Sequence, residues 1–323
     1  MLRFVKSTPW LYCLVVFFIW GCVTKSPRAE TPMADSSPSI SPAPSIEPQP
    51  PAVEPPVTPV SKKRIGLVLG GAGVASFATV GILKRFQQEG IGVDFIVTTG
   101  WPTLFSLGYG FLKSVHDLEW FAMRLQDKDF YAAGFFDSGR EFASHDKLSK
   151  LVSNAFKQDG IEDSKIPIII SAANIEPGDP DVYERGDWKN PLLKTMSVPG
   201  IYRPYPQDSD NKWVSSLQGL DVAEAIKRGP DLIVAVSMYD DYFALLKKNA
   251  GKKEGTEALF RQLYLTQLRN TIAREFKLAQ LTSRIQIDKN PNDFTAKRAA
   301  ILAGYKEGSR LAREIRRLVR ESE

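Results

Sequence analysis

Residues Arg64 to Thr103 read RIGLVLGGAGVASFATVGILKRFQQEGIGVDFIVTTGWPT. This pattern predicts a strand, a glycine-rich turn, a helix, a second strand and a second sharp turn. At the second sharp turn many α/β hydrolytic enzymes place a nucleophilic serine. This chain instead has Thr98-Thr99-Gly100-Trp101-Pro102 there. The stretch therefore predicts the frame of an active site without its nucleophile.

The length and charge of the chain limit its class. Its 323 residues suffice for one large α/β domain or two small ones, and 43% of them are hydrophobic, which is ordinary for a domain with a core. The formal net charge of +5 is too balanced to indicate a nucleic-acid partner. Basic residues gather late, in Arg310–Arg320, and we interpret them as the solvated face of a terminal helix.

Cysteine and histidine are scarce. The two cysteines, Cys13 and Cys22, both lie near the N-terminus, so the folded part is expected to have no disulfide and no thiolate metal site. The two histidines, His116 and His145, are too few for a histidine-rich zinc site. We therefore expect no metal and no cofactor.

The N-terminus has the pattern of a targeting signal. In residues 1–21, Arg3 and Lys6 precede a short apolar run, as in a signal peptide. Residues 19–22, Ile-Trp-Gly-Cys, resemble a bacterial lipobox, which predicts that Cys22 is lipidated, carries palmitate and becomes the new N-terminus. Val23 follows the cysteine, and by analogy with Gram-negative sorting this favours the outer membrane, facing the periplasm. The alternative is an uncleaved membrane anchor with an incidental cysteine.

Residues 22–62 form a predicted linker. Ten prolines fall between Thr31 and Val60 among serines and alanines. Such a segment buries too little apolar surface to fold and favours extended polyproline II geometry. We predict a disordered tether that joins the lipid to a folded domain over residues 63–323.

Apolar strands and helical periodicities alternate through the folded domain. Pro102–Gln126 and Thr256–Ala279 are predicted as long helices, and Lys165–Asn174 and Arg284–Ile287 as strands. Alternating βα units with continuous apolar strands indicate a mostly parallel sheet covered on both faces. The predicted fold class is a three-layer α/β/α domain with a central sheet.

The turn Gly70-Gly71-Ala72-Gly73 follows a strand and opens a helix. Free backbone N–H groups at such a turn can bind a phosphate or the oxyanion of an acyl-transfer intermediate; a tight turn without a ligand is the alternative. A dinucleotide site would need an acidic residue at the end of the second strand, but Asp94 stands at its start. A P-loop is excluded because no Gly-Lys-Ser/Thr closes the turn.

The order of these motifs resembles the patatin-like phospholipase family of serine–aspartate acyl hydrolases. Its first strand and turn read close to I-G-L-V-L-S-G-G-G-A-R-G, which resembles Ile65–Ser76, and its H-x-G-V-L helix resembles Thr79–Leu83. Its D-x-I-x-G-T-S-M-G and A-x-P-x-x-F-P-P stretches resemble Asp94–Pro102 and Ser197–Pro204. The resemblance runs over nearly all of Arg64–Val319 and implies a three-layer, patatin-like α/β fold and lipid-directed chemistry.

The departures from this family lie at its catalytic positions. The nucleophilic serine is replaced by Gly100, and the next elbow glycine by Pro102. The arginine of the oxyanion loop is replaced by Ala75, which leaves Gly70–Gly73 as the remaining oxyanion-type loop. The catalytic aspartate should follow Trp213-Val214, where this chain has Ser215. No member of the dyad is intact.

Other hydroxyl groups could only have taken over the chemistry by relocation. Ser106 is expected inside a helix, without the strained exposure of a nucleophile, and Thr99 and Thr103 lack a visible base. Ser144-His145-Asp146 resembles a triad on paper, but adjacent residues at a helix start do not face one another, so an N-cap role is favoured.

The leading hypothesis is a lipid-anchored, catalytically degenerate patatin-like domain in a bacterial cell envelope. It would bind a lipid, an acyl chain or a protein, and it would meet the membrane through its N-terminal lipid. The alternative is a divergent acyl hydrolase, a phospholipase or esterase, with relocated catalytic residues.

Overall fold

In the computed structural model, the strand predicted just after Arg64 is a central strand of a sheet. The structure describes residues 63–130, 145–176, 178, 180–199, 202–206, 209–249 and 255–321. The predicted signal peptide, lipidated Cys22, linker and Ser144 lie outside the described residues.

Seven strands form one sheet with the order β4-β3-β2-β1-β6-β7, and β5 pairs with β3. The strands are β1 (Ile65–Gly71), β2 (Phe95–Gly100), β3 (Ile168–Asn174), β4 (Pro180–Tyr183), β5 (Trp213–Ser215), β6 (Leu232–Met238) and β7 (Leu281–Arg284). β4 and β5 run antiparallel to β3, and the other pairings are parallel. Every residue of β1, β2 and β6 is buried, as expected for a sheet covered on both faces.

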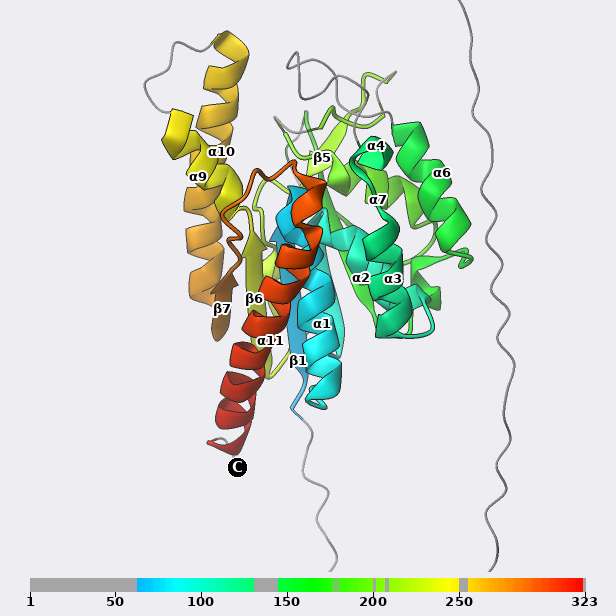
Figure 1. Cartoon of the computed structure of the whole chain (residues 1–323), viewed down its shortest axis with the longest axis vertical. Coiled ribbons are helices and arrows are strands. Elements are labelled where there is room, and N and C mark those ends of the chain that lie inside the picture. The colour runs from blue at the N-terminus through cyan, green and yellow to red at the C-terminus, as the bar shows by residue number, and fades with distance from the viewer. Residues whose placement is uncertain are drawn as a thin grey trace, which may run out of the picture. The chain divides into compact units, whose positions relative to one another are not determined.

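Helices of the described chain connect these strands (Figure 1). They are α1 (Ala78–Gln88), α2 (Pro102–Phe111), α3 (Val115–Arg124), α4 (Asp127–Phe130), α6 (His145–Ala155), α7 (Lys189–Met196), α8 (Val222–Ile226), α9 (Asp240–Asn249), α10 (Thr256–Glu275) and α11 (Lys297–Arg320), with short 3-10 turns η1 (Gly73–Phe77), η2 (Ile161–Asp163), η3 (Phe276–Leu278) and η4 (Phe294–Ala296). Within the described residues no helix combines the length and apolarity needed to cross a bilayer.

Alternate residues of β1 identify the two helical layers, because successive strand residues face opposite sides of a sheet. Gly71 faces Ser76, in the turn η1 before α1, and Pro102, at the start of α2. Gly70 faces Gly219 and Leu220, which precede α8. Helices therefore cover both faces of a mostly parallel sheet. The predicted α/β class with a central sheet is confirmed.

The C-terminal helix α11 packs directly on α1 (Figure 1). A β-carbon added to Gly81 of α1 would lie 2.0 Å from the carbonyl oxygen of Ile301. One added to Gly304 of α11 would lie 2.0 Å from the carbonyl oxygen of Ala78. The two backbones can approach this closely only because both positions are glycine. The last helix is thereby fitted to the first βα unit.

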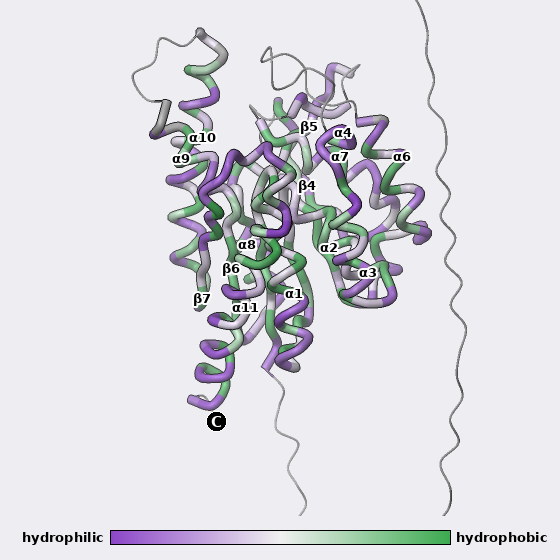
Figure 2. Tube along the Cα trace, in the orientation of Figure 1, coloured by the Kyte–Doolittle hydropathy of each residue, from purple (hydrophilic) through white to green (hydrophobic). Residues whose placement is uncertain are grey.

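Two predicted elements were wrong. The helix predicted over Pro102–Gln126 is two helices, because Leu112 is extended with ψ 155° and the Ser114 hydroxyl caps α3 by accepting from the Asp117 N–H at 3.2 Å. A strand was predicted over Arg284–Ile287. The observed strand, β7, spans Leu281–Arg284 and so lies before the predicted range, sharing only Arg284 with it. In Figure 2, α2 is largely apolar, whereas apolar and polar residues alternate along α3 and α11, as in surface helices.

Candidate functional site at the carboxyl edge of the sheet

In the sheet, β2 lies on one side of β1 and β6 lies on the other, so the strand order reverses direction at β1. In α/β sheets such a switch of strand order opens a crevice at the carboxyl ends of the strands, where ligands commonly bind. Gly71 at the end of β1 pairs with Gly100 of β2 and with Met238 of β6. The glycine turn and the sharp turn singled out in the sequence therefore meet at this edge.

Gly100 occupies the tip of an elbow between β2 and α2. It adopts φ +72°, a left-handed conformation that favours glycine. Trp101 is already helical and Pro102 is the first residue of α2, which suits its fixed φ. The Gly100 N–H donates to the Thr195 hydroxyl at 2.8 Å. The strand–turn–helix geometry of a nucleophile elbow is thus present without a nucleophile.

The elbow tip also has no room for a side chain. A β-carbon added to Gly100 would lie 2.2 Å from the carbonyl oxygen of Gly71 and 3.2 Å from the Tyr239 hydroxyl. The Trp101 N–H donates to the same Gly71 carbonyl at 3.0 Å, which holds the two turns together. A serine at position 100 would require the elbow and the glycine turn to separate.

The predicted oxyanion-type loop, residues Gly70, Gly71, Ala72 and Gly73, is buried throughout. Gly73 has φ +65°, and a β-carbon there would lie 2.4 Å from the carbonyl oxygen of Pro291. That carbonyl accepts the N–H of Val74 at 2.8 Å. The segment before η4 therefore covers the turn and takes up the first donor of the helix that follows it.

Aromatic side chains fill the space beside the elbow. We call them the Trp101 cluster: Phe77, Trp101, Phe105, Phe130, Tyr202 and Phe294. Trp101 is 1% exposed; its ring stacks on Phe130 at 4.9 Å and 17° and meets Tyr202 edge-on at 5.3 Å. Phe294 contacts both Trp101 and Phe77, at 6.0 and 5.6 Å. The cluster makes this edge part of the hydrophobic core.

Ser215, at the position of the family's aspartate, ends β5 and is fully buried. Its N–H donates to the Ser197 carbonyl at 3.1 Å. The next residue connects it to the elbow, since the Ser216 N–H donates to the Thr99 hydroxyl at 2.9 Å. The structure therefore brings positions 100 and 215 together through their neighbours.

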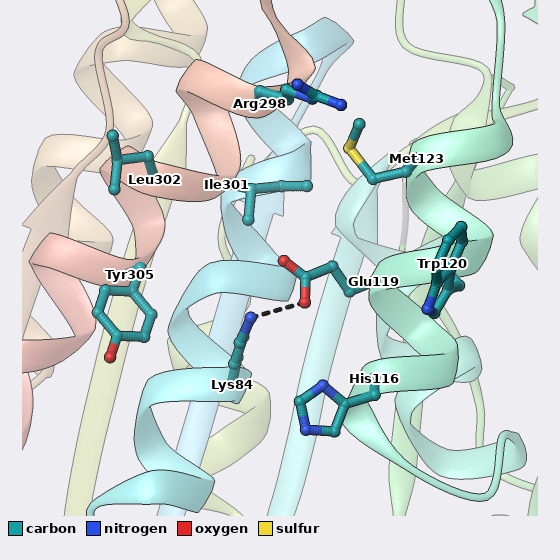
Figure 3. A pocket seen from close by; sticks show the side chains of 9 residues that line it. All are labelled: Lys84, His116, Glu119, Trp120, Met123, Arg298, Ile301, Leu302 and Tyr305. Atoms are coloured by element: carbon teal, nitrogen blue, oxygen red, sulfur yellow. Dashed lines mark hydrogen bonds and ion pairs between the residues drawn. The ribbon is translucent and has the colours of Figure 1, made fainter. Parts of the chain in front are cut away.

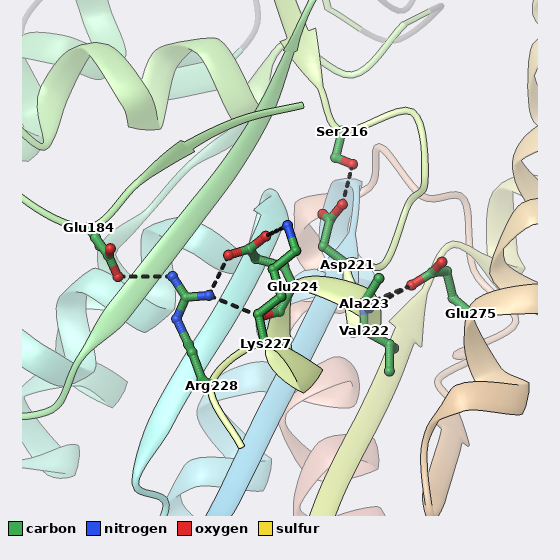
Figure 4. Close-up of polar contacts among 9 residues, drawn as sticks. All are labelled: Glu184, Ser216, Asp221, Val222, Ala223, Glu224, Lys227, Arg228 and Glu275. Atoms are coloured by element: carbon green, nitrogen blue, oxygen red, sulfur yellow. Dashed lines mark hydrogen bonds and ion pairs between the residues drawn. The ribbon is translucent and has the colours of Figure 1, made fainter. Parts of the chain in front are cut away.

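Sequence reasoning missed a buried serine–aspartate pair in the same loop. The Ser216 hydroxyl donates to Oδ1 of Asp221 at 2.7 Å (Figure 4). Asp221 is 6% exposed, and burial raises its pKa to about 6, with a smaller contribution from the charge of Glu275. An aspartate at the start of the helix predicted over Leu220–Arg228 was the available signal, but such a residue is usually a cap.

A second buried carboxyl group, that of Glu275, binds the start of α8 just after Asp221. Its Oε2 accepts the Val222 N–H at 2.8 Å and the Ala223 N–H at 3.4 Å at the start of α8 (Figure 4). Burial raises the pKa of Glu275 too. Two carboxyl groups with raised pKa values thus lie beneath the carboxyl edge of the sheet.

The other hydroxyl candidates are engaged in the interior. Ser106 is buried and donates to the Pro102 carbonyl at 3.0 Å, and Thr103 shares a hydrogen bond of 3.2 Å with Thr98. The buried His145 Nε2 lies 3.0 Å from the Ser197 hydroxyl, which itself donates to a backbone carbonyl. While the Ser197 hydroxyl donates to that carbonyl, the His145 ring can only donate to the hydroxyl.

The chain is similar in sequence to a set of known esterases. No protein-family model matches it. It is 24% identical over 192 residues to lysophospholipase NTE1 of Kluyveromyces lactis, which is 55% of this chain and 13% of that protein. It is 27% identical over 173 residues to neuropathy target esterase sws of Drosophila virilis, 48% of this chain and 11% of that protein. The chain is a distant homologue of the patatin-like esterases.

The homology covers about half of this chain and a small part of those much longer relatives. Among solved structures, VipD from Legionella pneumophila aligns with 78% of this chain and 67% of its own, at 9% identity and a TM-score of 0.41. The residues at the elbow and after β5 therefore have to be judged from their own geometry.

Proposed function

We propose that this chain is a catalytically degenerate patatin-like domain that acts by binding a lipid or a protein at a cell envelope. The observation that carries the proposal is the closed tip of the elbow. Gly100 supplies no nucleophile, and the Gly71 carbonyl occupies the space that a β-carbon would need. The homology to esterases supports a fold built for lipid hydrolysis, and the elbow supports the loss of that reaction.

The second catalytic position supports the same conclusion. Ser215 has no carboxylate and is buried at the end of β5. In serine hydrolases the loss of one catalytic residue already lowers the rate by several orders of magnitude. With both positions changed and the Trp101 cluster packed beside the elbow, turnover at this edge should be negligible.

The test is covalent labelling of the full chain with a fluorophosphonate probe, together with hydrolysis of short acyl esters. The expected result is no label and no hydrolysis above that of the heat-denatured protein. Labelling of a single serine or threonine, abolished by its replacement, would overturn the proposal.

The pair Ser216–Asp221 favours one alternative, a divergent acyl hydrolase with relocated residues. Its hydrogen bond joins the hydroxyl directly to a carboxylate, as a serine–aspartate dyad requires. If this alternative holds, Ser216→Ala abolishes labelling and hydrolysis, and Asp221→Asn lowers both. Ser106→Ala, which removes another buried hydroxyl outside the pair, leaves them unchanged.

We also propose that Cys22 anchors the chain in the outer membrane, on its periplasmic side. Labelled palmitate should be incorporated into the full chain and lost in Cys22→Ala. Cys13→Ala is the matched control, because Cys13 lies within the predicted signal peptide. Incorporation that persists in Cys22→Ala would contradict the anchor.

A further inference from the structure

A groove of about 650 Å³ lies on the outer side of the helical layer, between α1, α3 and α11. Figure 3 shows the side chains that line it. They are Lys84, His116, Glu119, Trp120, Met123, Arg298, Ile301, Leu302 and Tyr305. None of these residues belongs to the elbow, the glycine turn or the loop after β5.

The groove presents apolar side chains to solvent. Trp120 from α3 is 67% exposed and Leu302 from α11 is 53% exposed. Met123 and Ile301 lie between them and complete an apolar surface from one helix to the other (Figure 3). Ile301 is only 8% exposed, so Trp120 and Leu302 form the solvent-facing part of this surface, and an apolar surface within a groove is a candidate binding site.

One positive charge in the groove has no counter-charge within hydrogen-bonding distance among the described residues. Lys84 and Glu119 form an ion pair at 2.6 Å in the middle of the groove (Figure 3), so their charges cancel. Arg298, at the α11 end, forms no ion pair with any residue that the structure describes. As far as the described part of the chain goes, the groove therefore combines an apolar surface with one unpaired cation at its end.

The walls of the groove are held in place. Lys297, next to Arg298, reaches from α11 to α3 and donates to the carbonyl oxygens of Met123 and Leu125 at 2.5 and 2.6 Å. These carbonyls end α3, where a cation also complements the helix dipole. The groove is thus formed before a ligand arrives, which lowers the cost of binding.

We propose that this groove binds a single aliphatic chain that ends in one anionic group, a carboxylate or a phosphate. The chain lies along Trp120, Met123, Ile301 and Leu302, and the anion meets Arg298. The volume falls in the range of small-molecule sites. An apolar wall with one cation at its end fits a small amphipathic ligand, because such sites combine a mostly apolar lining with a few polar groups.

The test uses a palmitate analogue with a photoreactive diazirine, added to membranes that contain the full chain. After irradiation, the label should map to peptides from α3 (Val115–Arg124) and the start of α11. Palmitate and hexadecyl phosphate should compete, and hexadecanol, which lacks the charge, should compete poorly. Whichever of the two anions competes better identifies the headgroup.

Two variants and a control distinguish binding in the groove from nonspecific hydrophobic binding. Arg298→Gln should weaken competition by palmitate about fivefold, the effect of one exposed ion pair, and leave competition by hexadecanol unchanged. Leu302→Glu should abolish the label, because it places a second carboxylate in the apolar wall. Arg313→Gln, about four turns further along α11, should change nothing.

Label that maps elsewhere, persists in Leu302→Glu, or is displaced equally by hexadecanol would overturn the proposal. Crosslinks from the groove to a protein chain in place of the probe would also overturn it, because they would identify a macromolecular partner. None of these outcomes depends on hydrolysis, so they leave the degenerate elbow as a separate question.

Discussion

The carboxyl edge of the sheet and the groove between α3 and α11 each contain a tryptophan, and the two residues are used in opposite ways. Trp101 is 1% exposed within the Trp101 cluster, whereas Trp120 is 67% exposed. The first fills the place where a catalytic cleft would open, and the second forms the wall of an open groove. The difference contrasts an elbow whose surroundings are filled by aromatic rings with a groove on the outer helices whose apolar wall faces solvent.

The largest expected difference is in the stability lost when each of these two tryptophans is replaced by alanine. Trp101→Ala should destabilise the domain by about 4 kcal/mol, because it leaves a cavity among rings that cannot collapse. Trp120→Ala should cost less than about 0.5 kcal/mol. Urea unfolding followed by circular dichroism measures both. Equal losses would mean that the edge is not part of the core.

The next comparison uses two glycines with positive φ. Gly100→Ser should cost about 3 kcal/mol, from the left-handed backbone and from the collision with the Gly71 carbonyl. Gly229, with φ +60° and no atom near an added β-carbon, isolates the backbone cost, so Gly229→Ser should lose only about 1 kcal/mol. A stable Gly100→Ser protein that reacts with fluorophosphonate would show that the elbow can reopen.

The buried Asp221 makes stability depend on pH. Its pKa is about 6 in the folded chain and about 3.9 when unfolded, so the folded state binds the proton more tightly. The stabilisation that Asp221 adds to the free energy of unfolding is fully present below about pH 4 and is lost as pH rises through about 6.

In Asp221→Asn this contribution disappears. Between pH 4.5 and 7.5 the wild type should therefore lose about 2 kcal/mol more than the variant does. Denaturant titrations at the two pH values measure the difference. Glu275 also has a raised pKa and remains in both proteins, so only the difference between them tests Asp221. Parallel pH profiles would show that Asp221 is solvated.

The smallest expected effect concerns the groove wall. Lys297→Met keeps the aliphatic stem and removes two hydrogen bonds to the end of α3, at a cost of about 1 kcal/mol. Lys306→Met, at an exposed position of the same helix, should be neutral. Hydrogen exchange in the last turn of α3 should quicken only in the first variant, and unchanged exchange would remove Lys297 from the wall.

Local sequence patterns were enough to predict the sheet and the elbow. Continuous apolar runs placed β1 and β2, and Gly100-Trp101-Pro102 predicted a sharp turn followed by a helix. Element boundaries were less predictable: the break at Leu112 depends on the Ser114 cap, in a region where helical periodicity continues on both sides. β5, α7 and α9 carried no pattern strong enough to be predicted.

The closed state of the edge could not be predicted, because it depends on distant partners. The Trp101 cluster joins residues from Phe77 to Phe294, and aromatic composition does not show which rings will meet. The contact between Gly71 and Gly100 follows from strand register, which the sequence alone does not determine. The pair Ser216–Asp221 was missed because its significance comes from burial.

The packing of α11 on α1 has a consequence for how the chain acquires its structure. Gly81 and Gly304 bring into contact two helices that are more than two hundred residues apart, and β1 is completed only when β6 pairs with it. In a chain that emerges N-terminus first, β1 can pair with β2 early, but the face of α1 that α11 covers stays uncovered until α11 is available. Contacts of such sequence separation slow folding and prolong the exposure of apolar surface. The covering of α1 therefore depends on a segment far along the chain, and truncation within α11 should destabilise α1.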